Sequence, residues 1–246
     1  MANPALRGNR LRSIEKATSG ETVMSYSGVL RALGSMSIFG AIAALVGWHY
    51  TRVSVTGGVS SRASVLMLGA VLAAFVVAMV LIMRPKWAKG LGIAYSVLEG
   101  VAVGVISKIY EIGSHGIVGE ALGVSLGVAV VVWFLYATKI IRVTSKVVRV
   151  IVFATMGACA FYLVSLFSVL LGGPNLDGSG GLAGVGISLI LALIAASTFL
   201  TDWYQIDALI ASGAEESYNW YGAFSLLLSF IWLYLEVLRL LLKLRR

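Results

Sequence analysis

Charged residues and prolines are scarce in this chain, and each scarcity excludes a class of structure. Of the 246 residues, only 12% are charged, 59% are hydrophobic, and the mean hydropathy is +0.93. A soluble domain of this length could not bury so much apolar surface. The three prolines, Pro4, Pro85 and Pro174, fall in the N-terminal tail or in expected loops, so no expected spanning segment is broken by proline. The composition predicts an all-α integral membrane protein.

Cysteine and histidine are also rare. The single cysteine, Cys159, excludes an intrachain disulfide and gives no evidence about redox compartment. The two histidines fall at expected loop ends, and the chain has no HExxH, GxSxG or phosphate-loop motif. We therefore expect neither enzymatic activity nor a bound cofactor. A retinal photoreceptor is discarded too, because its Schiff base needs a lysine within the last helix, whereas Lys243 lies at the very end of the last apolar segment.

Seven apolar stretches are long enough to cross a membrane, which takes about 20 mostly apolar residues. Charges and glycines separate them near residues 28–50, 63–83, 88–110, 116–137, 147–171, 181–201 and 219–242. The sixth stretch could continue as a helix to residue 210, and each boundary is good to about 3 residues. We predict a polar, basic tail at 1–27, without a cleavable signal peptide, and a single seven-helix transmembrane domain at 28–246.

Basic residues, which give the chain a net charge of +8, gather at the ends of the predicted spans. Three clusters precede the first span, follow the second and separate the fourth from the fifth: Arg7, Arg10, Arg12 and Lys16; Arg84, Lys86 and Lys89; Lys139, Arg142, Lys146 and Arg149. All three lie on one side if the N-terminus is cytoplasmic, as the positive-inside rule expects for an inner (plasma) membrane protein. The partner that this pattern indicates is the lipid bilayer rather than nucleic acid.

The last loop and the C-terminus do not follow this topology. Seven crossings place the basic C-terminal end outside, and they place the acidic loop between the sixth and seventh spans inside. Either the earlier basic clusters dominate orientation, or the last segment does not cross fully. We favour seven crossings.

Three carboxylates lie where a membrane helix would normally avoid them: Glu99 in the third stretch, Asp202 directly after residue 201 of the sixth and Glu236 in the seventh. An ionisable group at membrane depth costs roughly 2.5 to 3.5 kcal/mol on insertion scales, so each is a candidate functional residue. Glu99 lies about halfway through its span and must be protonated, paired or facing water. The alternative is a neutral glutamic acid that pins two helices, next to Gly100 and Gly104, whose spacing lets a neighbouring backbone approach closely.

The seventh span carries a polar face. Ser229, Glu236 and Lys243 follow one another at seven-residue steps, so they lie along one side of the helix with about 10 Å of rise per step. Arg239 lies three residues beyond Glu236 and can pair with it within the helix. This local pair is the alternative to a functional role for Glu236.

Four stretches together resemble the Bax inhibitor-1 family, also called the transmembrane Bax-inhibitor-motif family. They are SVLEGVAVG in the third span, KIIRVTSK between the fourth and fifth, FLTDWYQID closing the sixth and FIWLYLEVLRLL in the seventh. The resemblance covers roughly residues 80–246, and its specificity comes from the ordered set rather than from any one motif. The last segment, WLYLEVLRLL, is similar to a bacterial branch of the family.

The resemblance implies a seven-helix fold with the last helix central and a pH-sensitive calcium leak. In the family arrangement, two aspartates on the sixth and seventh helices share a proton, and an arginine closing the second helix latches them. Asp202, in its D-x-x-Q-I setting, matches the first aspartate, and Arg84 matches the latch arginine. Ser229 stands in LSFIW where an LDFIN-like run is expected, so the two-aspartate pair is absent. Glu236, about 10 Å further along the same face, is too distant to replace it.

Two functions are compatible with these residues. The first is a pH-sensitive cation leak channel or transporter, with calcium as the transported ion and with Asp202 latched by Arg84 in the closed state. The alternative is a non-conducting membrane scaffold that regulates membrane proteases or stress and cell-death proteins, which are partners that the resemblance also implies. Ser229 favours the scaffold, because a scaffold tolerates the loss of half of the proton sensor.

Hard cations take oxygen ligands, which limits the residues that could line an ion pathway. Asp202, Glu99 and Glu236 are predicted to form a weak, transient calcium site, and Ser229 and Asp207 are further candidates for the pathway. Asp202 and Asp207 do not form a paired site by themselves. Five residues on a continuous helix correspond to about 500° of rotation, so the two side chains point in different directions.

Overall fold

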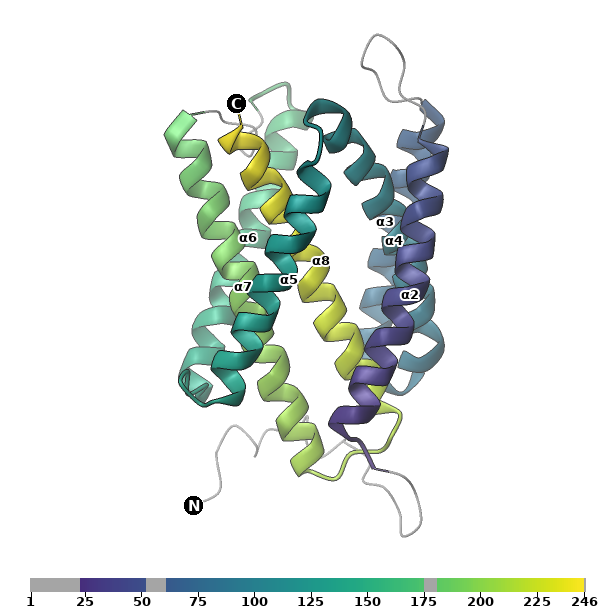
Figure 1. The fold of residues 1–246 in the computed structure, drawn as a ribbon, viewed down its shortest axis with the longest axis vertical. Helices are drawn as coiled ribbons and strands as arrows, with labels where there is room; N and C mark the ends of the chain where they lie inside the picture. Colours follow the sequence, from purple (N-terminus) through teal and green to yellow (C-terminus); the bar gives the residue numbers. More distant parts are fainter. Residues whose placement is uncertain (1–22, 52–60, 175–180, 246) are drawn as a thin grey trace. The chain divides into compact units, whose positions relative to one another are not determined.

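The computed structural model describes residues 23–51, 61–174 and 181–245, which are almost entirely helical (Figure 1). The elements are α2 (Tyr26–Tyr50), α3 (Ser61–Met83), the short 3-10 helix η2 (Pro85–Trp87), α4 (Ala88–Gly113), α5 (Ile117–Ala137), α6 (Ser145–Leu170), α7 (Gly181–Ala211) and α8 (Tyr218–Leu244). Within the described residues, seven helices are long and apolar enough to cross a membrane, and no strand forms. The prediction of a seven-helix, all-α membrane protein is confirmed.

The helix ends follow local sequence signals. Ser25 caps α2 by accepting a hydrogen bond from the Gly28 backbone N–H, and Thr144 caps α6 in the same way. The predicted spans agree with the helices to within about three residues, the boundary error expected of sequence patterns. The sixth span is the exception: α7 continues to Ala211, which confirms the longer of its two predicted ends.

The described residues divide into two compact units, and each is described by itself. Unit 1 contains the described residues up to Ile109 together with Tyr204–Leu227, and unit 2 contains Tyr110–Trp203 together with the residues from Leu228 onward. Both α7 and α8 contribute one part to each unit. The predicted tail at 1–27 lies mostly outside the described residues, and a single domain at 28–246 stays a prediction.

In unit 1, α2 and α4 pack backbone against backbone. A Cβ atom added to Gly100 would lie 2.3 Å from the Gly40 carbonyl oxygen, and one added to Gly104 would lie 2.0 Å from the Ala44 carbonyl oxygen. Only glycine allows two helices to approach so closely. The close approach predicted at Gly100 and Gly104 is confirmed.

In unit 2, the second part of α8 is in contact with both α6 and α7 (Figure 1). In the most apolar 18-residue segment of α8, 44% is buried, whereas the share is 17% in the corresponding segments of α5 and α6. Leu233 and Leu238 are almost completely buried in this part of the helix. The same share, 44%, is buried in α4, so burial alone does not single out α8, and the central position of the last helix stays a prediction.

Candidate functional site

Asp202 meets Ser229 inside unit 2. The Ser229 hydroxyl donates a hydrogen bond of 2.5 Å to Asp202 Oδ2, which links α8 to α7. The hydroxyl of Thr198, one turn before Asp202, lies 2.9 Å from Ser229 Oγ. Both Asp202 and Ser229 are buried. Serine therefore lies opposite Asp202 and offers a hydroxyl where the family arrangement has a second carboxyl.

The charge environment of Asp202 is unusual for a buried carboxylate. Among the described basic residues of unit 2, none forms an ion pair with it. Burial removes water from a carboxylate, and proteins ordinarily compensate with a cation or with several donors. Asp202 has the Ser229 hydroxyl instead.

A Ser229→Ala variant should lose about 1 to 3 kcal/mol of free energy of unfolding, because the buried Asp202 carboxyl would lose its hydroxyl donor. The matched control is Ser225→Ala, one turn earlier on α8, whose hydroxyl bonds only to the Gly222 carbonyl oxygen of its own helix. We expect the control to change stability by less than about 0.5 kcal/mol. Denaturant unfolding in detergent measures both variants, and equal losses would contradict a special role for Ser229.

Arg84 lies in unit 1, at the N-cap of η2 directly after α3. Its guanidinium carbon is 5.9 Å from the ring centroid of Trp87, within the range of a cation–π interaction. Asp202 belongs to unit 2. The latch between Arg84 and Asp202 joins residues of the two units and stays a prediction.

Glu99 and Asp207 both lie in unit 1. Glu99 is half-buried near the middle of α4, and its carboxyl forms no hydrogen bond or ion pair with another described side chain. Asp207 accepts a hydrogen bond from the Tyr26 hydroxyl of α2. Asp202 and Asp207 thus have different partners, as their spacing predicts, and both Glu99 and Asp207 remain candidates for an ion pathway.

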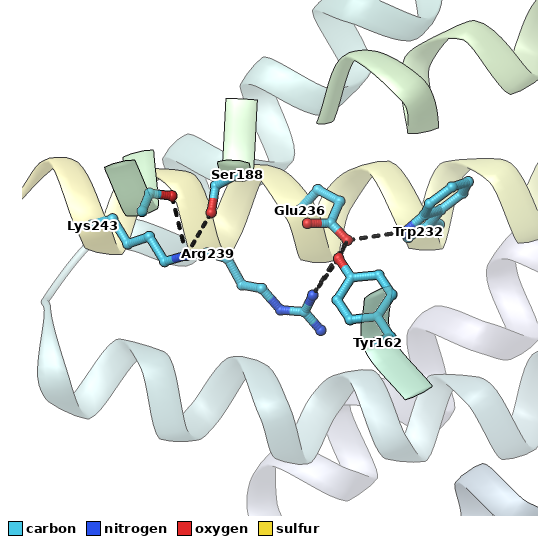
Figure 2. Close-up of polar contacts among 7 residues, drawn as sticks. Tyr162, Ser188, Trp232, Glu236, Arg239 and Lys243 are labelled. Carbon is cyan, nitrogen blue, oxygen red and sulfur yellow. Dashed lines mark hydrogen bonds and ion pairs between the residues drawn. The ribbon is translucent and has the colours of Figure 1, made fainter. Parts of the chain in front are cut away.

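Glu236 is the centre of a polar cluster between α6 and α8 in unit 2 (Figure 2). Its Oε1 accepts hydrogen bonds from the Tyr162 hydroxyl of α6 and from Trp232 Nε1, the latter at 2.9 Å. Arg239 Nη1 lies 3.3 Å from the same oxygen and donates to the Tyr162 hydroxyl at 2.7 Å. The predicted local pair of Glu236 and Arg239 forms, and a role of Glu236 in an ion pathway stays a prediction. Sequence reasoning missed Tyr162, which is 74 residues away from Glu236 along the chain.

Lys243 continues the polar face of α8 by one further step (Figure 2). Its Nζ donates hydrogen bonds to Ser188 Oγ at 2.8 Å and to the Gly184 carbonyl oxygen at 3.3 Å, both on α7. Ser229, Glu236 and Lys243 therefore bind α7, α6 and α7 in turn. The three residues at seven-residue spacing each make a contact with a neighbouring helix of unit 2.

A calcium site built from three carboxylates stays a prediction. Glu99 belongs to unit 1, whereas Asp202 and Glu236 belong to unit 2. In the part of the chain that the structure describes, no three residues among the histidines, cysteines and acids are grouped so that they could hold a metal ion. Within unit 2, Asp202 accepts from Ser229 and Glu236 pairs with Arg239.

Comparison with known proteins identifies the family of this chain. A sequence model of a protein family described as Bax inhibitor 1 like matches residues 3–246. No curated protein matches the chain. The family match includes all the residues of the sites described above.

Proposed function

Because the chain belongs to the Bax inhibitor 1 like family of membrane proteins, we propose that it is a pH-sensitive cation leak channel or transporter, with calcium as the transported ion. The proposal places it in the plasma (inner) membrane with a cytoplasmic N-terminus, as its basic clusters favour. It includes no catalytic step and no cofactor.

The observation that carries the proposal is the buried contact of Asp202 with Ser229 between two membrane-spanning helices. A carboxylate at this depth is costly, by roughly 2.5 to 3.5 kcal/mol on insertion scales, and such residues mark ion and proton pathways. Because a hydroxyl both donates and accepts, Ser229 can donate to an ionised Asp202 and can accept from a protonated one. One serine therefore supports both protonation states, which a proton-sensing site requires.

The proposed latch gives the pH response its sign. In the closed state, the Arg84 guanidinium pairs with the ionised carboxylate of Asp202. Protonation of Asp202 removes the negative charge that holds Arg84, so the pair weakens and the helices are free to separate. The leak should therefore increase as pH falls.

Calcium flux into proteoliposomes of the purified protein tests this, at about pH 6 and about pH 8, on either side of neutrality. We expect a larger wild-type flux at the lower pH and a flux without pH dependence in Asp202→Asn, which has no ionisable group at that position. Glu216→Gln, which neutralises an exposed loop carboxylate, is the control and should keep the wild-type response.

Full pH dependence in Asp202→Asn would contradict the latch. No flux at either pH would contradict conduction and would favour the scaffold that regulates membrane proteases or stress and cell-death proteins. The assay contains no partner protein, so any flux belongs to this chain alone.

A further inference from the structure

The Glu236 cluster is separate from Asp202 and lies further along α8. Seven residues, or about 10 Å of helix rise, lie between Ser229 and Glu236. Only 1% of the Glu236 side chain is exposed, against 28% of the Arg239 side chain. The carboxylate is therefore inside unit 2, and the guanidinium reaches it from a more open position.

The groups around the Arg239 guanidinium are those that would bind a free cation (Figure 2). A carboxylate oxygen of Glu236 and the hydroxyl oxygen of Tyr162 lie 3.3 Å and 2.7 Å from the same guanidinium nitrogen. The guanidinium carbon is also 5.0 Å from the Tyr162 ring centroid, where cation–π attraction acts. One negative charge, one neutral oxygen and one aromatic ring suit a singly charged occupant.

We propose that Glu236 and Tyr162 form a cation-binding site that the chain fills with its own Arg239, so that this guanidinium blocks cation passage along α8 in unit 2. The inference rests on the proposed conducting function. A tethered cation competes at a high effective concentration, so dilute free ions do not displace it. Arginine also stays charged at any physiological pH, so the block does not titrate away.

Lys243 is the control position that separates the loss of a bound cation at Glu236 from a general effect of removing a positive charge. It carries the same charge one turn further along α8, and it donates hydrogen bonds to Ser188 and to a backbone carbonyl of α7. Removal of either residue changes the net charge equally. Only removal of Arg239 vacates the site at Glu236 and Tyr162.

The first measurement is thermal unfolding of Arg239→Ala in dilute guanidinium chloride and in sodium chloride of equal ionic strength. Guanidinium is the probe because it reproduces the group that has been removed. It should raise the unfolding midpoint of Arg239→Ala and leave those of the wild type, Lys243→Ala and Glu236→Gln/Arg239→Ala unchanged. If Arg239→Ala does not fold, Arg239→Gln replaces it throughout.

The second measurement is cation flux into proteoliposomes of the same variants. Flux through Arg239→Ala should exceed that of the wild type by about tenfold, the factor that one charge-assisted hydrogen bond represents. Dilute guanidinium should reverse the increase. Arg239→Lys, which keeps a tethered cation, should conduct as the wild type does, and so should Lys243→Ala.

The two measurements separate the site from the conducting function. Equal responses to guanidinium in Arg239→Ala and in Glu236→Gln/Arg239→Ala would overturn the cation site, whatever the flux. Stabilisation by guanidinium in a protein that conducts in no variant would support the site and overturn the proposed function and the block together. A tenfold increase in Lys243→Ala would show a general charge effect and overturn the block.

Discussion

A Gly104→Ala variant will lose about 3 kcal/mol of free energy of unfolding, at the upper end of the usual cost of overpacking. The added Cβ would lie 2.0 Å from the Ala44 carbonyl oxygen, and Cβ atoms essentially never approach another heavy atom within 3.0 Å. The obstacle is helix backbone, which cannot rotate away as a side chain can. Relief requires α2 and α4 to separate, and separation would also disturb the contact between Gly100 and Gly40.

The control for this variant is Gly127→Ala in α5. Gly123 and Gly127 have the same four-residue spacing as Gly100 and Gly104, but a Cβ at either position meets no described heavy atom within 4 Å. Alanine in an open helical position should stabilise by roughly 0.5 to 1 kcal/mol. Denaturant unfolding of both variants in the same detergent tests this prediction. Changes in the free energy of unfolding that have the same sign in both variants would contradict the close packing of α2 on α4.

The second large loss of stability is expected when Arg239 is removed from its ion pair with Glu236. Arg239→Met should lose about 3 to 5 kcal/mol of free energy of unfolding, because it leaves the Glu236 charge in the interior of unit 2. Glu236→Met should lose less, since the arginine side chain is partly exposed and can extend toward the interface. The double variant, which removes both charges, should recover most of the loss.

These three variants and the wild type form a double-mutant cycle, measured by denaturant unfolding. A double variant more stable than Arg239→Met would show that Arg239 balances a buried charge, and a double variant close to the wild type would show that the pair contributes little net stability. If the two single losses simply added, Glu236 and Arg239 would act independently, and the ion pair at 3.3 Å would have no energetic consequence.

Composition was sufficient to predict the seven spans, since a run of apolar residues of this length has few alternatives to a membrane helix. The end of α7 was harder to place. Asp202, Gln205 and Asp207 follow the apolar run, and polar residues there are compatible with the end of a span or with a helix that continues. The structure shows the continued helix, which ends at Ala211.

The glycine pairs show what spacing alone cannot reveal. Gly100 with Gly104 and Gly123 with Gly127 have identical patterns, yet only the first pair contacts a neighbouring described helix. Periodicity determines which residues share a face of a helix. Whether another helix packs against that face depends on the arrangement of the whole bundle.

The same reasoning applies to the polar contacts. The pair of Glu236 with Arg239 was predictable, because three residues along one helix determine the geometry. The role of Tyr162 was not, because its contact depends on how α6 packs against α8. The position of Ser229 opposite Asp202 followed from the family resemblance and not from periodicity, since the two residues lie on different helices.

Because α8 supplies part of both units, the order of synthesis matters for assembly in the membrane. Ribosomes complete α8 after every other described helix, so neither unit has its full core while α2 to α7 are being inserted. Until then Asp202 lacks Ser229, and Tyr162 lacks the carboxylate that it binds. These polar groups of α6 and α7 therefore gain their partners in unit 2 only once α8 has been inserted.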